Sequence, residues 1–171
     1  MASSLSPRLI LVGGGARSGK SRYALERSMS IAGTRAFIAT AQAFDDEMTQ
    51  RIAKHREERG ETFVTIEEPV DLARAVASPF DVIVVDCLTL WLSNILLGGR
   101  DVMKDFSTLE ASLKETKGTV ILVTNEVGCG IVPENKLARE FRDYAGVLNS
   151  RIATIADEVY WMVFGQALRV K

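Results

Sequence analysis

The 171-residue sequence is poor in several features that mark specialised classes of protein. Its two cysteines, Cys87 and Cys129, are too few to hold together a disulfide-rich secreted scaffold. Its apolar runs are strand-length, well short of the roughly 20 residues that a membrane-spanning helix needs. The stretch before Arg8 lacks the apolar segment of a signal peptide. We therefore expect a cytoplasmic protein with no membrane span.

The sequence also lacks an excess of charge of either sign. Its 21 lysines and arginines are balanced by 22 aspartates and glutamates, for a formal net charge of -1. Because proteins dedicated to nucleic acids are usually basic, we expect no nucleic-acid partner. No internal repeat or low-complexity segment interrupts the chain, and 47% of its residues are apolar. This length and composition predict a single domain over residues 1–171.

Short apolar runs rich in β-branched residues alternate along the chain with segments of helical character. Apolar runs without polar alternation are typical of strands that are covered on both faces. The pattern predicts an α/β fold: three layers, with a mostly parallel central sheet and helices on both of its faces. The predicted strands are residues 9–12, 36–40, 63–66, 82–85, 120–123 and 159–164.

The predicted helices differ in how strongly the sequence supports them. The longest covers residues 134–156, where Leu137, Phe141, Leu148, Ile152 and Ile155 follow helical spacing and form one apolar stripe. Gly165, directly after the last strand, suggests an edge hairpin whose strand direction the sequence leaves open. Residues 98–101 form the most loop-like interior segment. The remaining predicted helices cover residues 18–31, a segment that starts at 45–47, 69–76 and 107–117.

Residues 14–21 carry the most specific motif of the sequence. They read Gly14-Gly15-Ala16-Arg17-Ser18-Gly19-Lys20-Ser21 and fit the phosphate-loop pattern G-x-x-x-x-G-K-[ST]. The backbone N–H groups of such a loop face phosphate oxygens, Lys20 would reach the β- and γ-phosphates, and Ser21 would ligate Mg²⁺. An ordinary glycine-rich turn is the alternative. The position between a predicted strand and a predicted helix favours nucleotide binding.

Polar residues follow several of the predicted strands. Asp86 ends the run 82–85, which is the form of a Walker B segment whose carboxylate holds Mg²⁺ directly or through water. Thr40, Glu67 and Asn125-Glu126 also stand at strand ends, where open α/β sheets bind ligands. For Thr40 alone, the exposure of a loop explains the polarity equally well. A switch GTPase is a poor interpretation, since Asn135-Lys136-Leu137-Ala138 lacks the Asp of the guanine-binding N-K-x-D motif.

His55 is the only histidine of the sequence. It shares a helical face with Met48 and Ile52, so a satisfied core residue is one interpretation. Arg51 and Arg59 stand four residues to either side of it. Two guanidinium groups there would favour the neutral imidazole, which can attack phosphorus, and could also bind a triphosphate. A solvated charged face formed with Glu57 and Glu58 remains the alternative for these arginines.

With these residues in view, the chain resembles the bifunctional adenosylcobinamide kinase/adenosylcobinamide-phosphate guanylyltransferase family of cobalamin biosynthesis. The resemblance runs from Leu9 to Lys171. Besides the phosphate loop and the placed His55, it rests on the block Thr124-Asn125-Glu126-Val127-Gly128 and on Gly130-Ile131-Val132-Pro133. The further matching segments are 38–41, 45–48, Arg51-Ile52, Arg56, Arg59, Arg139 and 141–143.

The resemblance implies a RecA-like P-loop fold assembled as a homotrimer. It also implies phosphorylation of adenosylcobinamide by ATP or GTP, followed by transfer of GMP from GTP, through a guanylylated histidine, to adenosylcobinamide phosphate. Catalysis would then fall on His55 and Lys20, and Mg²⁺ binding on Ser21 and Asp86. The nucleotide-contacting positions of the family fall on Gly14, Gly15, Ala16, Arg17, Ser18, Gly19, Lys20, Ser21, Ala39, Thr40, Ala41, Arg56, Glu57, Glu58, Arg59, Glu67 and Asp86.

Two other functions account for part of these observations. A P-loop kinase for another small alcohol or a nucleotide would use Lys20, Ser21 and Asp86 equally well, but it leaves His55 without a role. A RecA-like assembly protein that uses ATP as a switch would need no acceptor alcohol.

Overall fold

The computed structural model describes residues 8–42 and 60–171. In these ranges the chain forms a seven-stranded sheet with the strand order β3-β2-β4-β5-β1-β6-β7. All neighbouring strands pair in parallel except β7, which runs antiparallel to β6. The strands are β1 (Leu9–Gly14), β2 (Arg35–Ala39), β3 (Val64–Glu67), β4 (Val82–Asp86), β5 (Thr119–Val123), β6 (Glu158–Val163) and β7 (Gln166–Arg169).

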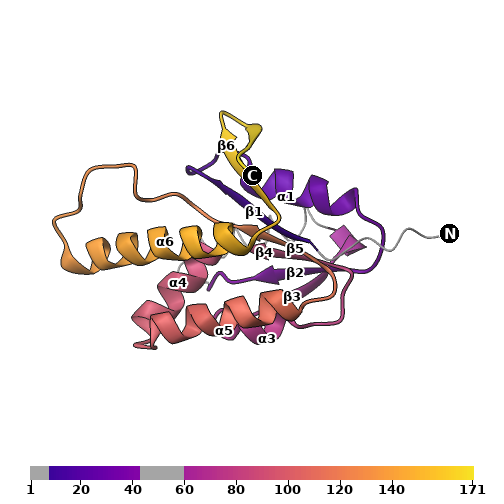
Figure 1. Cartoon of the computed structure of the whole chain (residues 1–171), viewed down its shortest axis with the longest axis horizontal. Coiled ribbons are helices and arrows are strands. Elements are labelled where there is room, and N and C mark those ends of the chain that lie inside the picture. Colours follow the sequence, from indigo (N-terminus) through magenta and orange to yellow (C-terminus); the bar gives the residue numbers. More distant parts are fainter. Residues whose placement is uncertain (1–7, 43–59) are drawn as a thin grey trace.

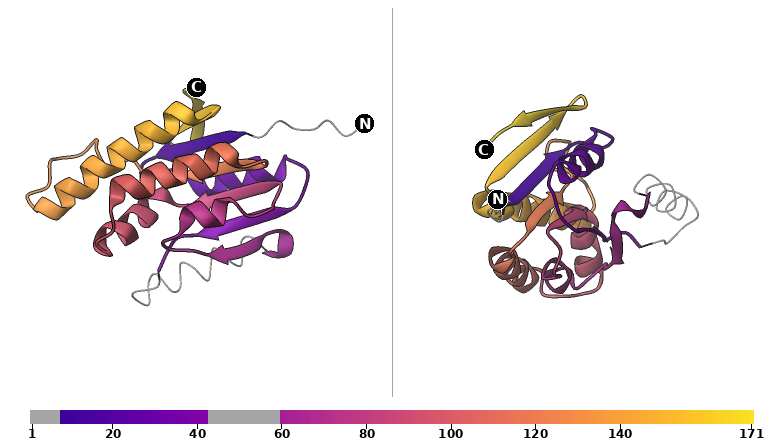
Figure 2. Two further views of the ribbon diagram at one scale, coloured as in Figure 1. Left: turned by 60° about the horizontal axis from the view of Figure 1, so that its bottom comes forward. Right: turned by 90° about the vertical axis from the view of Figure 1, so that its right-hand side faces the viewer.

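Helices cover both faces of this sheet, which confirms the predicted three-layer α/β fold (Figures 1 and 2). One face carries α1 (Lys20–Met29). The other carries α3 (Leu72–Val76), α4 (Leu88–Leu97), α5 (Val102–Glu115) and α6 (Lys136–Ile155). A short 3-10 helix, η1 (Gly60–Thr62), precedes β3.

The central strands are apolar throughout because each contributes to two cores. In β4, Ile83 and Val85 belong to the core under α3 to α6, whereas Val82 and Val84 belong to the core under α1. Successive side chains of a strand point to opposite faces, so a strand between two helical layers needs apolar residues at every position. The same division holds along β1 and β5.

The sequence-based helix predictions were incomplete between residues 88 and 107. Helix α4 was not predicted: its sequence, LTLWLSNILL, is apolar on most sides and gives little amphipathic periodicity. Helix α5 begins at Val102 and not at Ser107, because the Asp101 side chain caps it by accepting a hydrogen bond from Lys104 N at 3.1 Å. Helix α3 begins at Leu72, three residues later than predicted.

The C-terminal half of the chain agrees more closely with the sequence-based expectations. β6 and β7 form the predicted edge hairpin, with Phe164 and Gly165 at positive φ in the turn. In α6, Leu148 and Ile152 are buried as expected, but Leu137 in the first turn is 45% exposed. This turn follows a long loop that leaves β5 and extends past the end of the sheet (Figure 1). Across the two described ranges, no helix is long and apolar enough to cross a membrane.

Candidate functional site

The loop between β1 and α1 has the backbone geometry that its glycines predict. Gly14 has φ 151°, and a Cβ there would lie 2.8 Å from Ser18 Oγ and 2.9 Å from Met162 O, so no larger residue fits. Gly19 has φ 91° and is the N-cap residue of α1. Because this cap has no side-chain hydrogen bond and the first turn of α1 holds no acidic residue, the helix N-terminus is suited to an anion.

Lys20 folds back over this loop. Its side chain is buried, 7% exposed, and Nζ donates to Gly15 O at 2.5 Å and lies 3.4 Å from Ser18 Oγ. The ammonium group is therefore held against the backbone that would surround a phosphate. Ser21 follows in the first turn of α1 and is half-buried. These two residues are the side chains that the sequence assigned to phosphate charge and to Mg²⁺.

Asp86 stands at the carboxyl end of β4, two strands away from β1. Its register partners are Ala39 on β2 and Val123 on β5. Two strand spacings correspond to about 10 Å, a gap that a bound phosphate, a metal ion and water can fill. Among the described residues, no three His, Cys, Asp or Glu side chains gather as a metal cage. One hydroxyl and one carboxylate suit Mg²⁺, which usually keeps waters and phosphate oxygens as its other ligands.

The start of the β5–α6 loop lies between the phosphate loop and Asp86. Thr124 N donates to Val12 O at 3.0 Å, and Glu126 N donates to Gly14 O at 3.1 Å. The first bond continues the pairing of β5 with β1, and the second joins the loop after β5 to Gly14, the first residue of the phosphate loop. The sequence predicts that Asn125 and Glu126 belong to the site, and the strand order supports this because β5 lies between β1 and β4.

The start of the β5–α6 loop is held in place by two residues that the sequence analysis did not identify. Thr89 on α4 accepts a hydrogen bond from Asn125 N at 2.7 Å. Asn149 on α6 accepts one from the Thr124 hydroxyl at 2.7 Å. Thr89 and Thr124 are buried, so their hydroxyl groups need such partners. The helical predictions gave no sign of Thr89, because α4 itself was not predicted.

Thr40 is not the exposed loop residue that its polarity suggested. It is fully buried, and its hydroxyl donates to Cys87 O at 2.7 Å and accepts from Cys87 N at 2.8 Å. The Asp86–Cys87 peptide bond between β4 and α4 is cis. Burial, helped by the charge of Asp86, raises the pKa of the Cys87 thiol to about 11. Cys87 is therefore a packed thiol and not a nucleophile at neutral pH.

The predicted nucleotide contacts divide into two regions along the carboxyl edge of the sheet. Residues 14–21 and Asp86 lie around β1 and β4, whereas Ala39 ends β2, Thr40 and Ala41 follow it, and Glu67 ends β3. Ala39 pairs with Asp86 on one side and with Glu67 on the other, so these residues form a row across three strands. Glu67 is exposed, and four strand spacings put it about 19 Å from β1. The triphosphate group of a nucleotide does not cover that distance alone, but the attached ribose and base lengthen the ligand.

The remaining predicted site residues lie outside the described ranges. They are His55, Arg51, Arg56, Glu57, Glu58 and Arg59. The described chain leaves the carboxyl end of β2 at Gln42 and resumes at Gly60, before β3. The roles that the sequence suggests for these residues stay predictions.

Several known proteins are similar to this chain over nearly its whole length. Residues 10–170 match the family model described as cobinamide kinase / cobinamide phosphate guanyltransferase. A bifunctional adenosylcobalamin biosynthesis protein of Salmonella typhimurium is 42% identical over 181 residues, covering 95% of this chain and 99% of that protein. One of Pseudomonas aeruginosa is 44% identical over 167 residues, covering 94% and 96%.

A solved structure is similar in fold alone. The flagellar accessory protein FlaH from Methanocaldococcus jannaschii superposes with a TM-score of 0.53 and 14% sequence identity, covering 97% of this chain and 79% of that one. The family match, in contrast, spans nearly the whole sequence, including the phosphate loop and Asp86. The chain belongs to the cobinamide kinase / cobinamide phosphate guanyltransferase family.

Proposed function

We propose that this chain carries out both reactions of its family on one corrinoid substrate. In the first, the aminopropanol hydroxyl of adenosylcobinamide attacks the γ-phosphorus of ATP or GTP, and the nucleoside diphosphate leaves. In the second, GMP from GTP is passed to adenosylcobinamide phosphate, giving adenosylcobinamide-GDP and pyrophosphate. The observation that carries the proposal is the phosphate loop with Lys20 folded over it, in a chain that matches the bifunctional family from residue 10 to residue 170.

The kinase step needs positioning and charge neutralisation more than a protein nucleophile. Lys20 and the N–H groups at the start of α1 offset the negative charge of the transferring phosphoryl group. Ser21 and Asp86 would hold Mg²⁺, which neutralises phosphate oxygens. The hydroxyl proton leaves to solvent or to a nearby base as the new O–P bond forms and the bond to the diphosphate breaks.

The guanylyl step uses His55 as the nucleophile. A neutral imidazole nitrogen attacks the α-phosphorus of GTP, pyrophosphate leaves, and a phosphoramidate bond holds GMP on the protein. An oxygen of adenosylcobinamide phosphate then attacks that phosphorus and the N–P bond breaks. The support for His55 is its place in the family motif and the absence of any other histidine in the sequence. Cys87, with its raised pKa, is unsuited to the role.

The nucleotide would extend across the sheet from the phosphate loop towards the β2–β3 end. Its phosphates would lie near β1, and Ala39–Ala41 and Glu67 would contact the ribose and base. Arg56, Glu57, Glu58 and Arg59 are the further nucleotide contacts that the family resemblance suggests. The row of register partners Asp86, Ala39 and Glu67 supports one continuous binding surface.

A direct test separates this function from the two alternatives. The full chain is mixed with Mg²⁺, GTP and adenosylcobinamide, and the products are weighed by mass spectrometry. We expect adenosylcobinamide phosphate followed by adenosylcobinamide-GDP. In parallel, α-³²P-GTP should label the protein with an acid-labile bond. A kinase for another alcohol would give neither corrinoid product nor label, and a nucleotide switch would leave the corrinoid unchanged.

Three further expectations accompany this function. We propose that residues 1–171 form one nucleotide-binding domain, that it assembles as a homotrimer and that it works in the cytoplasm. Support for the first is that both cores pack on the same sheet. Sedimentation equilibrium of the full chain, with and without GTP, tests the trimer.

A further inference from the structure

One side chain on α4 links the two loops that form the β2–β3 end of the site. The Asn94 amide Nδ2 donates to Thr40 O at 2.8 Å and to Pro69 O at 2.9 Å. Thr40 directly follows β2, and Pro69 follows β3 with only Glu68 between them. A primary amide has two N–H donors, so a single side chain satisfies both carbonyl groups. Asn94 is also the one amide in an otherwise largely apolar helix.

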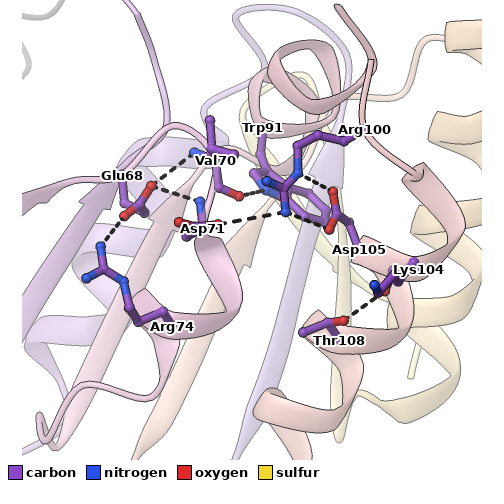
Figure 3. Close-up of polar contacts among 9 residues, drawn as sticks. All are labelled: Glu68, Val70, Asp71, Arg74, Trp91, Arg100, Lys104, Asp105 and Thr108. Carbon is purple, nitrogen blue, oxygen red and sulfur yellow. Dashed lines mark hydrogen bonds and ion pairs between the residues drawn. The ribbon is translucent and has the colours of Figure 1, made fainter. Parts of the chain in front are cut away.

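The turn after β3 is held by other side chains as well (Figure 3). Trp91, one helical turn before Asn94, donates from Nε1 to Val70 O at 2.8 Å. The Glu68 carboxylate accepts from Val70 N at 3.1 Å and from Asp71 N at 2.8 Å, and Arg74 donates to it at 2.9 Å. Desolvation opposes the charge of Glu68, but these bonds outweigh it and lower its pKa, so the carboxylate stays ionised.

The base of this turn is tied to α5 through Arg100. Its guanidinium donates to Asp105 at 2.7 and 2.9 Å and lies 3.8 Å from Asp71 (Figure 3). The loop after β2 has its own support, since the Thr40 hydroxyl bonds both backbone groups of Cys87. Each loop is therefore fixed separately, and Asn94 sets the position of one relative to the other.

Backbone pairing alone does not fix this relative position. The bonding between the two strands reaches Glu68 N, which donates to Ala39 O at 3.0 Å. No backbone hydrogen bond joins the two described loops beyond that point, and Asn94 bonds the carbonyl of the next residue in each loop, Thr40 O and Pro69 O. Loss of its amide would leave two carbonyl groups, that of the buried Thr40 and that of the half-buried Pro69, without this donor.

We propose that Asn94 is a positioning residue of the nucleotide site: it holds the loops after β2 and β3 so that Ala39–Ala41 and Glu67 face the same ribose and base. The inference rests on the proposed function, which assigns those residues to the nucleotide. Asn94 acts through the two carbonyl groups and makes no contact with the phosphates. Its loss should weaken recognition of the nucleoside and spare recognition of the phosphate chain.

Two ligands separate these effects in the full chain. Isothermal titration in the presence of Mg²⁺ gives two constants: the Kd of GTP, added as its α,β-methylene analogue so that the protein is not guanylylated, and the Kd of inorganic tripolyphosphate, which has no ribose or base. Asn94→Asp has nearly the same shape but puts a carboxylate against both carbonyl groups. We expect it to raise the Kd of GTP about tenfold or more and to leave the Kd of tripolyphosphate within about twofold. Asn94→Ala, which removes the donors without adding charge, should give the same pattern to a smaller extent.

Two other variants calibrate the measurement. Trp91→Phe removes the bond to Val70 O and part of a buried ring but leaves both Asn94 bonds in place, so it should weaken GTP binding less than Asn94→Asp does. Lys20→Ala should weaken the binding of both ligands, because both place phosphates in the loop. Thermal unfolding of each variant shows whether it is folded at the temperature of the titration.

The outcomes decide between positioning and plain stability. An unchanged Kd of GTP in folded Asn94→Ala and Asn94→Asp would overturn the proposal. An equal rise in the Kd of both ligands in either variant would overturn it too, since that pattern indicates a general loss of structure. If the wild type itself binds tripolyphosphate but shows no preference for GTP, the proposed function fails first, and the role of Asn94 in nucleoside recognition fails with it.

Discussion

Lys20 is the residue on which the kinase assignment depends most directly. Its Nζ already lies against Gly15 O, at the centre of the phosphate loop. We predict that Lys20→Ala lowers the kinase kcat by at least about a hundredfold, because its buried ammonium group, held against the loop backbone, offsets the charge of the transferring group. Phosphorylated corrinoid is measured by mass spectrometry. Lys117→Ala, an exposed lysine at the opposite edge of the sheet, is the control. Near-normal kinase rates in folded Lys20→Ala would refute the assignment.

His55 is the residue that we propose as the nucleophile of the second reaction. We predict that His55→Asn abolishes acid-labile labelling by α-³²P-GTP and the guanylyl transfer that depends on it. Phosphorylation of the alcohol should continue, since direct in-line transfer needs Lys20 and Mg²⁺ but no protein nucleophile.

Two controls make the His55 result interpretable. Lys54→Ala removes the nearest alternative nucleophile in the sequence and should leave the label in place. Labelling that survives in His55→Asn would identify a different nucleophile. Loss of both reactions in a folded His55→Asn variant would instead favour a binding role for the imidazole.

At the scale of secondary-structure elements, the strand order decides which residues meet. β5 lies between β1 and β4, so Asp86 stands two strand spacings from the phosphate loop. A bound ligand and a metal ion would bridge this gap. We predict that Asp86→Asn raises the Mg²⁺ concentration needed for half-maximal activity about tenfold or more in at least one half-reaction. Titration of both half-reactions with Mg²⁺ is the measurement, and Asp101→Asn, an exposed cap residue on α5, is the control. An unchanged requirement would place Asp86 outside the metal shell.

The parts of the site that follow from local sequence were predictable, and the parts that depend on tertiary contacts were not. The phosphate loop and the strand before Asp86 have their own signals in spacing and apolar pattern. α4 had none, because a helix buried on most sides loses the periodicity that reveals helices. Thr89 and Asn94 were missed with it. The burial of Thr40 depends on Cys87, 47 residues away, which no local pattern could indicate.

At the scale of the whole molecule, the two edges of the sheet have different tasks. The carboxyl edge holds the phosphate loop and Asp86. The amino edge holds Glu158, the first residue of β6, which is 4% exposed and accepts from Arg8 at 2.7 Å, Arg27 at 3.3 Å and the Tyr160 hydroxyl at 2.7 Å. Burial opposes its charge, but these three partners outweigh burial and lower its pKa. Glu158 thus ties β6 to α1 and to the chain before β1.

This separation predicts a change in stability without a change in catalysis. The pKa of Glu158 is lower in the folded chain than the ordinary 4.5, so its charge contributes stability above pH 4.5 that is lost as the pH falls through the folded value. Glu158→Gln should lower the free energy of unfolding by about 1–3 kcal/mol near neutral pH, because Arg8 and Arg27 lose a buried partner. The difference from the wild type should shrink as urea unfolding is repeated at lower pH.

Glu26→Gln, which breaks only an exposed pair with Arg22, is the control and should change the free energy of unfolding little. A difference that stays constant with pH would show that the charge of Glu158 is not its source, and a loss of kinase activity in the folded variant would show that the two edges are coupled.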